Sequence, residues 1–133
     1  MPDAIPTSAA STEPPWLEDL FAAIDAQDTE AFLQFLAPDA HFRFGSAEKV
    51  SGHAAIGSAV DGFFTSIAGC EHRLHRVWQQ DDSLVCAGQV TYRRHDGSGV
   101  TLPFANVLEL AGERITGYYI YADLGPLYAP DQP

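Results

Sequence analysis

The chain has 133 residues and a formal net charge of -11, with 46% hydrophobic and 19% charged residues. These proportions are ordinary for one folded domain with its own core. The acidic balance argues against nucleic acid and anionic lipid as partners, since both are bound through basic side chains. No stretch approaches the roughly 18 apolar residues of a membrane span. The first residues lack the basic and apolar regions of a signal peptide, so we expect a cytoplasmic protein.

The first half of the chain predicts a tail followed by three helices. Residues 1–14 are rich in Pro, Ala, Ser and Thr, which is typical of a flexible tail. Pro15 suits the first turn of a helix, Asp28 can cap a second helix that Pro38 ends, and Ser51 or Gly52 opens a third. Apolar residues at helical spacing mark these helices: Trp16, Leu17, Leu20, Phe21 and Ile24; Phe32, Leu33, Phe35 and Leu36; and Ile56, Val60, Phe63, Phe64 and Ile67.

The second half predicts strands joined by tight turns. Residues 41–44 form a short strand, and four longer strands cover 70–79, 84–94, 100–110 and 114–122. Turn residues such as Asp96-Gly97-Ser98-Gly99 connect the last three strands as an antiparallel meander, which the first of the four can join through its own hairpin. The fold class is therefore α+β, with helices laid across one face of a bent antiparallel sheet. We expect a single domain over residues 15–128, with 129–133 as a C-terminal tail.

The last predicted strand is apolar or aromatic on both of its faces. Tyr118 and Ile120 alternate with Tyr119 and Tyr121, whereas a strand with one face in water alternates apolar with polar residues. We therefore expect the helices and an interior on one side of the sheet and a second subunit on the other. A homodimer through the outer sheet face is the predicted assembly.

The order of elements, together with several short strings, resembles a known family. The strings are Ala22-Ala23-Ile24-Asp25-Ala26-Gln27-Asp28, Leu36-Ala37-Pro38-Asp39-Ala40, Gly52-His53-Ala54-Ala55-Ile56, Gly112-Glu113-Arg114-Ile115 and Tyr121-Ala122-Asp123. Over residues 16–127 the chain is similar to the SnoaL-like branch of the nuclear transport factor two-like superfamily. The resemblance implies a cone-shaped sheet of four to five strands wrapped around three helices and a deep apolar pocket. It does not fix an activity, because one fold carries many functions.

Two reactions known in that superfamily lack their residues here. Aligned with ketosteroid isomerases, the base position falls on Phe44, the tyrosine position on Leu20, and the acid near Ala105 or Asn106. None of these side chains can perform those steps. Aligned with limonene epoxide hydrolases, the Asp–Arg–Asp positions fall on Gln89, Thr91 and Ile120, so that mechanism is not supported either.

Other acid–base candidates remain. Asp123 matches the family's terminal acid, although it can equally cap the following turn. Tyr118 is a further candidate catalytic residue, and either His72 or His75 is a candidate general base, because an imidazole suits that role. His72 and His75 point to opposite faces of one strand, so we expect no metal site from them, and the sequence implies no cofactor.

The remaining prediction is an apolar pocket for a small hydrophobic, polyketide-like or steroid-like molecule, with a filled core as the alternative. A non-catalytic binding domain and a proton-transfer enzyme of isomerase, cyclase or hydrolase type both stay open. Val90, Tyr92 and Val107 are expected on the outer face. The predicted pocket residues are Trp16, Leu20, Phe35, Phe44, Phe63, Trp78, Gln89, Thr91, Phe104, Asn106, Tyr118 and Ile120.

Overall fold

The structure is a computed structural model that describes residues 13–128. The predicted tails at 1–12 and 129–133 lie outside this range. The elements follow in the order α2 (Pro15–Asp25), α3 (Thr29–Leu33), β1 (Leu36–Phe44), β2 (Val50–Ser51), α4 (His53–Thr65), β3 (Gly69–Gln80), β4 (Ser83–Arg93), β5 (Gly99–Ala111), β6 (Arg114–Tyr121) and α5 (Gly125–Tyr128). No helix in the described part of the chain is both long and apolar enough to cross a bilayer.

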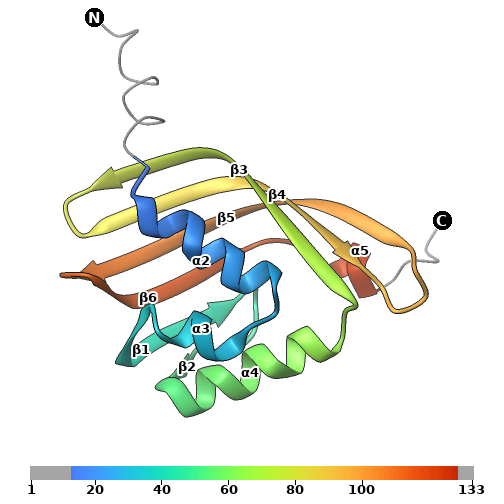
Figure 1. Ribbon diagram of the computed structural model, residues 1–133, viewed down its shortest axis with the longest axis horizontal. Helices are drawn as coiled ribbons and strands as arrows, with labels where there is room; N and C mark the ends of the chain where they lie inside the picture. Colours follow the sequence, from blue (N-terminus) through green and yellow to red (C-terminus); the bar gives the residue numbers. More distant parts are fainter. Residues whose placement is uncertain (1–12, 129–133) are drawn as a thin grey trace, which may run out of the picture.

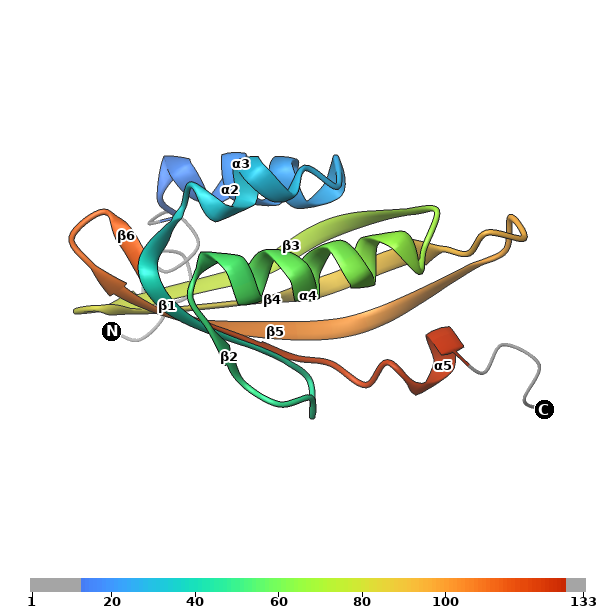
Figure 2. The ribbon, with the colours of Figure 1, turned by 90° about the horizontal axis from the view of Figure 1, so that it is seen from below.

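One six-stranded sheet runs in the order β2-β1-β6-β5-β4-β3. All neighbours are antiparallel except β1 and β6, which run parallel. Helices α2, α3 and α4 lie along one face of the sheet, and α5 lies at the end opposite the β3–β4 turn (Figures 1 and 2). The expected α+β class is confirmed, although β2 adds a sixth strand and the parallel pairing of β1 with β6 means that the sheet is not purely antiparallel.

The N-terminal helices begin and end where their local chemistry predicts. Pro15 occupies the first turn of α2, where its missing N–H costs nothing. The Asp28 side chain caps α3 by accepting a hydrogen bond from Ala31 N at 3.1 Å. Helix α3 is shorter than expected, because β1 already begins at Leu36. Residue Ala37 precedes Pro38 and therefore favours an extended backbone over a further helical turn.

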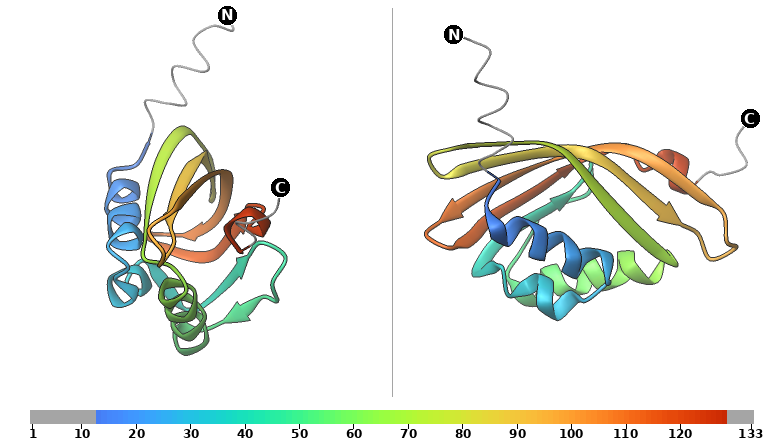
Figure 3. Two further views of the ribbon diagram at one scale, coloured as in Figure 1. Left: turned by 90° about the vertical axis from the view of Figure 1, so that its right-hand side faces the viewer. Right: turned by 45° about the horizontal axis from the view of Figure 1, so that its top comes forward.

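Irregularities in strand pairing bend the sheet around the helices, as the two views in Figure 3 show. The β3–β4 register shifts between Leu74 and Arg76, and the β5–β6 register shifts between Glu109 and Leu110. A β-bulge places an extra residue on one strand and increases its bend. Gly88 allows the backbones of β3 and β4 to approach closely at the first bulge, since a Cβ there would lie 2.0 Å from Arg73 O. The sheet is thus curled toward α2, α3 and α4.

The inward face of β4 is the opposite of the one expected. Val90 and Tyr92 are 1% and 3% exposed, whereas Gln89 and Thr91 are exposed on the outer face. The prediction that Gln89 and Thr91 face the interior is therefore wrong, as is the outward placement of Val90 and Tyr92. A shift of one residue moves every side chain of a strand to the other face.

Trp78 is also outside the core, with 42% of its surface exposed. Its neighbour Val77 is buried instead, because the bulge between Leu74 and Arg76 reverses the alternation of β3 after that point. The predicted place of Trp78 in the interior is therefore wrong. The core that remains is formed by α2, α3 and α4 against the inward residues of the sheet.

Candidate functional site

A cavity of about 50 Å³ lies in the core between the helices and the concave face of the sheet. Aromatic rings form much of its wall: Phe44 and Phe63 pack with centroids 4.7 Å apart, and Phe42 stacks on Tyr118 at 5.7 Å. Its lining is mostly apolar, which suits an apolar ligand held by a few polar groups. The lining residues are Ile24, Phe32, Phe42, Phe44, Val60, Phe63, Phe64, Cys70, His72, Val90, Tyr92, Phe104, Asn106, Tyr118 and Ile120.

The first polar group of the cavity is a histidine paired with a carboxylate. His72 on β3 lies with its Nδ1 2.6 Å from Oδ1 of Asp25, the last residue of α2. The backbone N of His72 donates to the other carboxylate oxygen of Asp25 at 2.9 Å. Because an ionised carboxylate can only accept hydrogen bonds, Nδ1–H is the donor in this pair, and in the neutral form of His72 the lone pair is then on Nε2.

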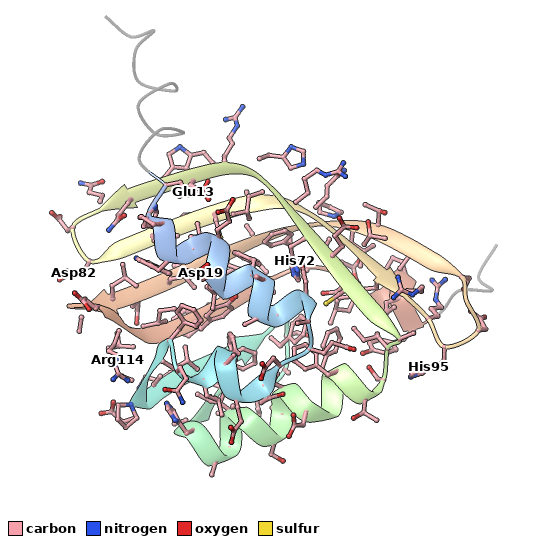
Figure 4. The ribbon with its side chains drawn as sticks, viewed as in Figure 1. Glu13, Asp19, His72, Asp82, His95 and Arg114 are labelled. Carbon is pink, nitrogen blue, oxygen red and sulfur yellow. The ribbon has the colours of Figure 1, made fainter. Side chains whose placement is uncertain are left out.

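Aromatic neighbours fix the plane of the imidazole. The His72 ring lies 5.0 Å from the Phe21 ring and 5.2 Å from the Phe104 ring, at 87° to the latter. Figure 4 places His72 between α2 and the sheet. The side chain of His72 is 11% exposed and that of Asp25 is 26% exposed. The pair is thus largely shielded from water, and this strengthens the hydrogen bond between them.

Cys70 is the third group at this end of the cavity. Its Sγ lies 3.8 Å from Oδ1 of Asp25 and 3.7 Å from Ile24 O. Burial, followed by the nearby carboxylate of Asp25, raises the pKa of the Cys70 thiol to about 12. The thiol is therefore protonated near neutral pH and is a poor nucleophile there.

Asp25, Cys70 and His72 also form a group whose ligand atoms lie within 4.8 Å of one another, as in a metal site. Two ligands bound at about 2.1 Å to a tetrahedral zinc ion are separated by about 3.4 Å. Nδ1 of His72 and Oδ1 of Asp25 are only 2.6 Å apart. Their spacing is that of a hydrogen bond.

The second polar group lies on β5 and β6. Asn106 is 2% exposed, and its Nδ2 donates to the hydroxyl oxygen of Tyr118 at 3.3 Å. Its Oδ1 is buried and has no hydrogen-bond partner among residues 13–128. Burial raises the pKa of Tyr118 well above its ordinary value, so this hydroxyl stays protonated. The pair therefore presents neutral hydrogen-bonding groups to the cavity.

Comparison with known proteins assigns the chain to a family. The sequence model described as the SnoaL-like domain matches residues 17–118. The chain belongs to the SnoaL-like domain family. A search of curated proteins finds no match.

Solved structures give the same fold for this SnoaL-like domain. A nuclear transport factor two-like protein of unknown function from Burkholderia pseudomallei is 18% identical with a TM-score of 0.76, over 84% of this chain and 90% of that one. A candidate SnoaL-like polyketide cyclase from Jannaschia is 18% identical with a TM-score of 0.77, over 88% and 90% of the two chains. A ketosteroid isomerase-like protein from Catenulispora acidiphila, crystallised with trimethylamine, is 17% identical with a TM-score of 0.78, over 85% and 88%.

The SnoaL-like domain brings six of the predicted pocket residues to the cavity. Trp16, Leu20 and Phe35 instead pack within or against the core, while Gln89 and Thr91 lie in a polar groove on the outer face. The six that line the cavity are Phe44, Phe63, Phe104, Asn106, Tyr118 and Ile120.

Two of the three predicted catalytic residues lie at the cavity, and the third lies outside it. His72 and Tyr118 both line the cavity, but Asp123 is exposed and does not. Its Oδ1 accepts a hydrogen bond from Gly125 N at 3.0 Å, which is the turn-capping role weighed from the sequence.

Asp25 is the acidic side chain that sequence reasoning missed, and the missed cavity-lining residues are Ile24, Phe32, Phe42, Val60, Phe64, Cys70, Val90 and Tyr92. A signal for Asp25 does exist in the sequence. An acidic side chain in the last turn of a helix faces the negative end of the helix dipole, which is unfavourable without a compensating partner. The partner is His72, which lies 47 residues further along the chain.

Proposed function

We propose that this SnoaL-like domain binds a small, largely apolar molecule in its cavity and transfers a proton to or from it. The observation that carries the proposal is the 2.6 Å pairing of His72 Nδ1 with Asp25 Oδ1 at the wall of an apolar cavity. A base needs an orienting partner and access to the substrate, and this pair supplies both.

The proton transfer follows from the chemistry of the two side chains. Nδ1–H of His72 donates to Asp25, which leaves the lone pair of Nε2 to accept a proton from a carbon next to a carbonyl group. The electron pair of the broken C–H bond moves onto the carbonyl oxygen and gives an enolate. Asp25 stabilises the imidazolium that forms, and return of the proton from Nε2 to carbon completes an isomerisation or exchange.

Cavity size sets the scale of the ligand. A volume of about 50 Å³ is well below the roughly 300–1,000 Å³ of sites for drug-sized ligands, and below the about 150 Å³ that holds benzene. We therefore propose a molecule of one small ring or less, rather than a fused polyketide or steroid. Even a one-ring ligand requires the side chain of the partly exposed Phe44 or Phe63 to move and enlarge the cavity.

Hydrogen–deuterium exchange of cyclopentanone tests the proposal. The α-hydrogens of this ketone exchange in D₂O by proton abstraction alone, and NMR follows the rate. His72→Gln should lower the protein-dependent rate by about 100-fold or more and Asp25→Asn by a smaller factor. His95→Gln is the matched control, because His95 is exposed and its side chain forms a hydrogen bond to Thr65 O, away from the cavity lining. Equal rates for the native protein and His72→Gln would contradict the proton-transfer role and leave only ligand binding.

We also propose that the domain pairs with a second copy through its outer sheet face. An apolar row crosses that face from β3 to β6, with one residue from each strand paired with the next. Its members are Trp78, Val85, Val107 and Tyr119. Tyr121 is 56% exposed beside this row. Burial of such a surface favours association of two identical chains.

A further inference from the structure

Asn106 is the buried polar residue whose hydrogen bonding is incomplete. Its side chain is 2% exposed, and its Oδ1 has no partner within the described part of the chain. A buried acceptor without a partner costs free energy, so native structures rarely keep one without a reason. Asn106 also lines the cavity, which makes a ligand group a natural partner for this oxygen.

Tyr118 completes the hydrogen-bonding pattern at this point. Its hydroxyl oxygen accepts a hydrogen bond from Asn106 Nδ2, so the hydroxyl hydrogen remains available for donation. The two side chains together offer one acceptor and one donor. A hydroxyl group has the complementary pattern, because it donates one hydrogen bond and accepts another. A methyl group of the same size satisfies neither side chain.

The position of this pair relative to His72 is set by β5. Phe104 contacts the His72 ring, with centroids 5.2 Å apart. Asn106 is the next residue of β5 on the same face, about 7 Å further along the strand. A ligand that reaches Asn106 therefore lies beyond Phe104, with its apolar body extending toward His72.

The surroundings favour a ligand group without charge. No Lys or Arg side chain lines the cavity, among the residues that the structure describes. Tyr118 stays protonated, and the amide of Asn106 carries no charge. An anion placed here would lose its hydration with no cation to replace it.

We infer that Asn106 and Tyr118 form a subsite for one uncharged hydroxyl group, that of a phenol or an enol. This inference rests on the proposed function and names the class of its substrate. The substrate brings this hydroxyl with it, and the hydroxyl takes no part in the proton transfer at His72. Its oxygen accepts from Tyr118, and its hydrogen is donated to Oδ1 of Asn106.

NMR titration with phenol, toluene and benzoate tests the inference on the full chain. Phenol and toluene have the same shape and the same number of non-hydrogen atoms, so they differ only in the group at issue. Phenol should bind about tenfold more tightly than toluene, because toluene leaves the amide oxygen without a partner. Benzoate should bind more weakly than phenol.

Two variants test whether Asn106 and Tyr118 form the subsite, and a third variant serves as the control. Asn106→Leu should reduce the preference for phenol over toluene to about twofold or less. Tyr118→Phe keeps the ring and should also reduce it, so the test does not depend on one variant folding. Thr91→Val, on the outer face, should leave the preference unchanged.

The outcomes separate the inference from the proposed function. Equal binding of phenol and toluene would overturn the subsite and leave the apolar cavity as a binding site. Tighter binding of benzoate, or a phenol preference that survives in both variants, would also overturn the subsite. Failure of phenol and toluene alike to bind would contradict the proposed ligand-binding function itself.

Discussion

Gly88→Ala perturbs the bend of the sheet that encloses the cavity. A Cβ at this position would lie 2.0 Å from Arg73 O and 3.0 Å from the Cα of Leu74, both backbone atoms of β3. Ordinary carbon–oxygen contact is more than 1 Å longer, so β3 has to move away from β4 at the bulge. Overpacking of this kind costs about 1–3 kcal/mol, and each weakened ladder hydrogen bond adds about 1 kcal/mol. Alanine regains up to about 1 kcal/mol in chain entropy, so with one ladder hydrogen bond weakened we expect a net loss of about 1–3 kcal/mol.

Urea unfolding followed by circular dichroism measures this loss. Gly62→Ala is the matched control, because a Cβ at Gly62 in α4 meets no atom within 4 Å. That variant should gain about 0.5–1 kcal/mol, since alanine is the better helix former. If Gly88→Ala unfolded with a free energy within about 0.5 kcal/mol of the native protein, the close approach of β3 and β4 would be refuted.

Three further predictions concern the His72–Asp25 pair, the thiol of Cys86 and the outer face of the sheet. Asp25→Ala should lower the free energy of unfolding by about 1–2 kcal/mol in a urea titration, because two hydrogen bonds to His72 are lost while the helix dipole is relieved. If Asp25→Ala lowered the free energy of unfolding by no more than Asp19→Ala, a change at an exposed residue, the stabilising role of Asp25 would be contradicted. Burial raises the pKa of Cys86 to about 12 from 9.0, so above pH 9 the unfolded thiol ionises before the folded one and the free energy of unfolding falls toward pH 12. Urea titrations of Cys86→Ala should show a shallower fall than those of the native chain, and an identical slope would count against it. Sedimentation at high micromolar concentration should give a dimer that Tyr121→Glu dissociates, whereas a monomer in both proteins would rule out the proposed interface.

The order of helices and strands could be predicted from periodicity and turn residues. Pro15 and Asp28 start helices α2 and α3, and turn residues separate the strands of the meander. The parallel pairing of β1 with β6 could not be predicted, because it joins residues 76 to 79 positions apart, such as Leu36 and Ile115. Local sequence patterns carry no information on such pairing.

The faces of the strands were harder to predict than the strands themselves. On β4, polar Gln89 and Thr91 alternate with apolar Val90 and Tyr92, and this pattern alone places Gln89 and Thr91 outside. The family alignment assigned the opposite face, and the alignment was wrong. For Trp78, alternation from His72 predicts the inside, but an unforeseen bulge reverses the faces.

The polar groups of the candidate site could be predicted only on the sheet side. Asn106 and Tyr118 share an inward face that alternation on β5 and β6 reveals. The pairing of His72 with Asp25 depends on how α2 lies across the sheet, which is set by tertiary packing. Asp25 alone, in the last turn of a helix, indicates a missing partner without naming it.

The tautomer of His72 tests the central claim most directly. Long-range ¹⁵N–¹H correlation spectra of the native protein distinguish a protonated from an unprotonated ring nitrogen. We predict protonated Nδ1 and unprotonated Nε2 for His72, and loss of this preference in Asp25→Asn, while the exposed His75 averages between forms as an internal reference. A proton on Nε2 of neutral His72, or averaging like that of His75, would contradict the account.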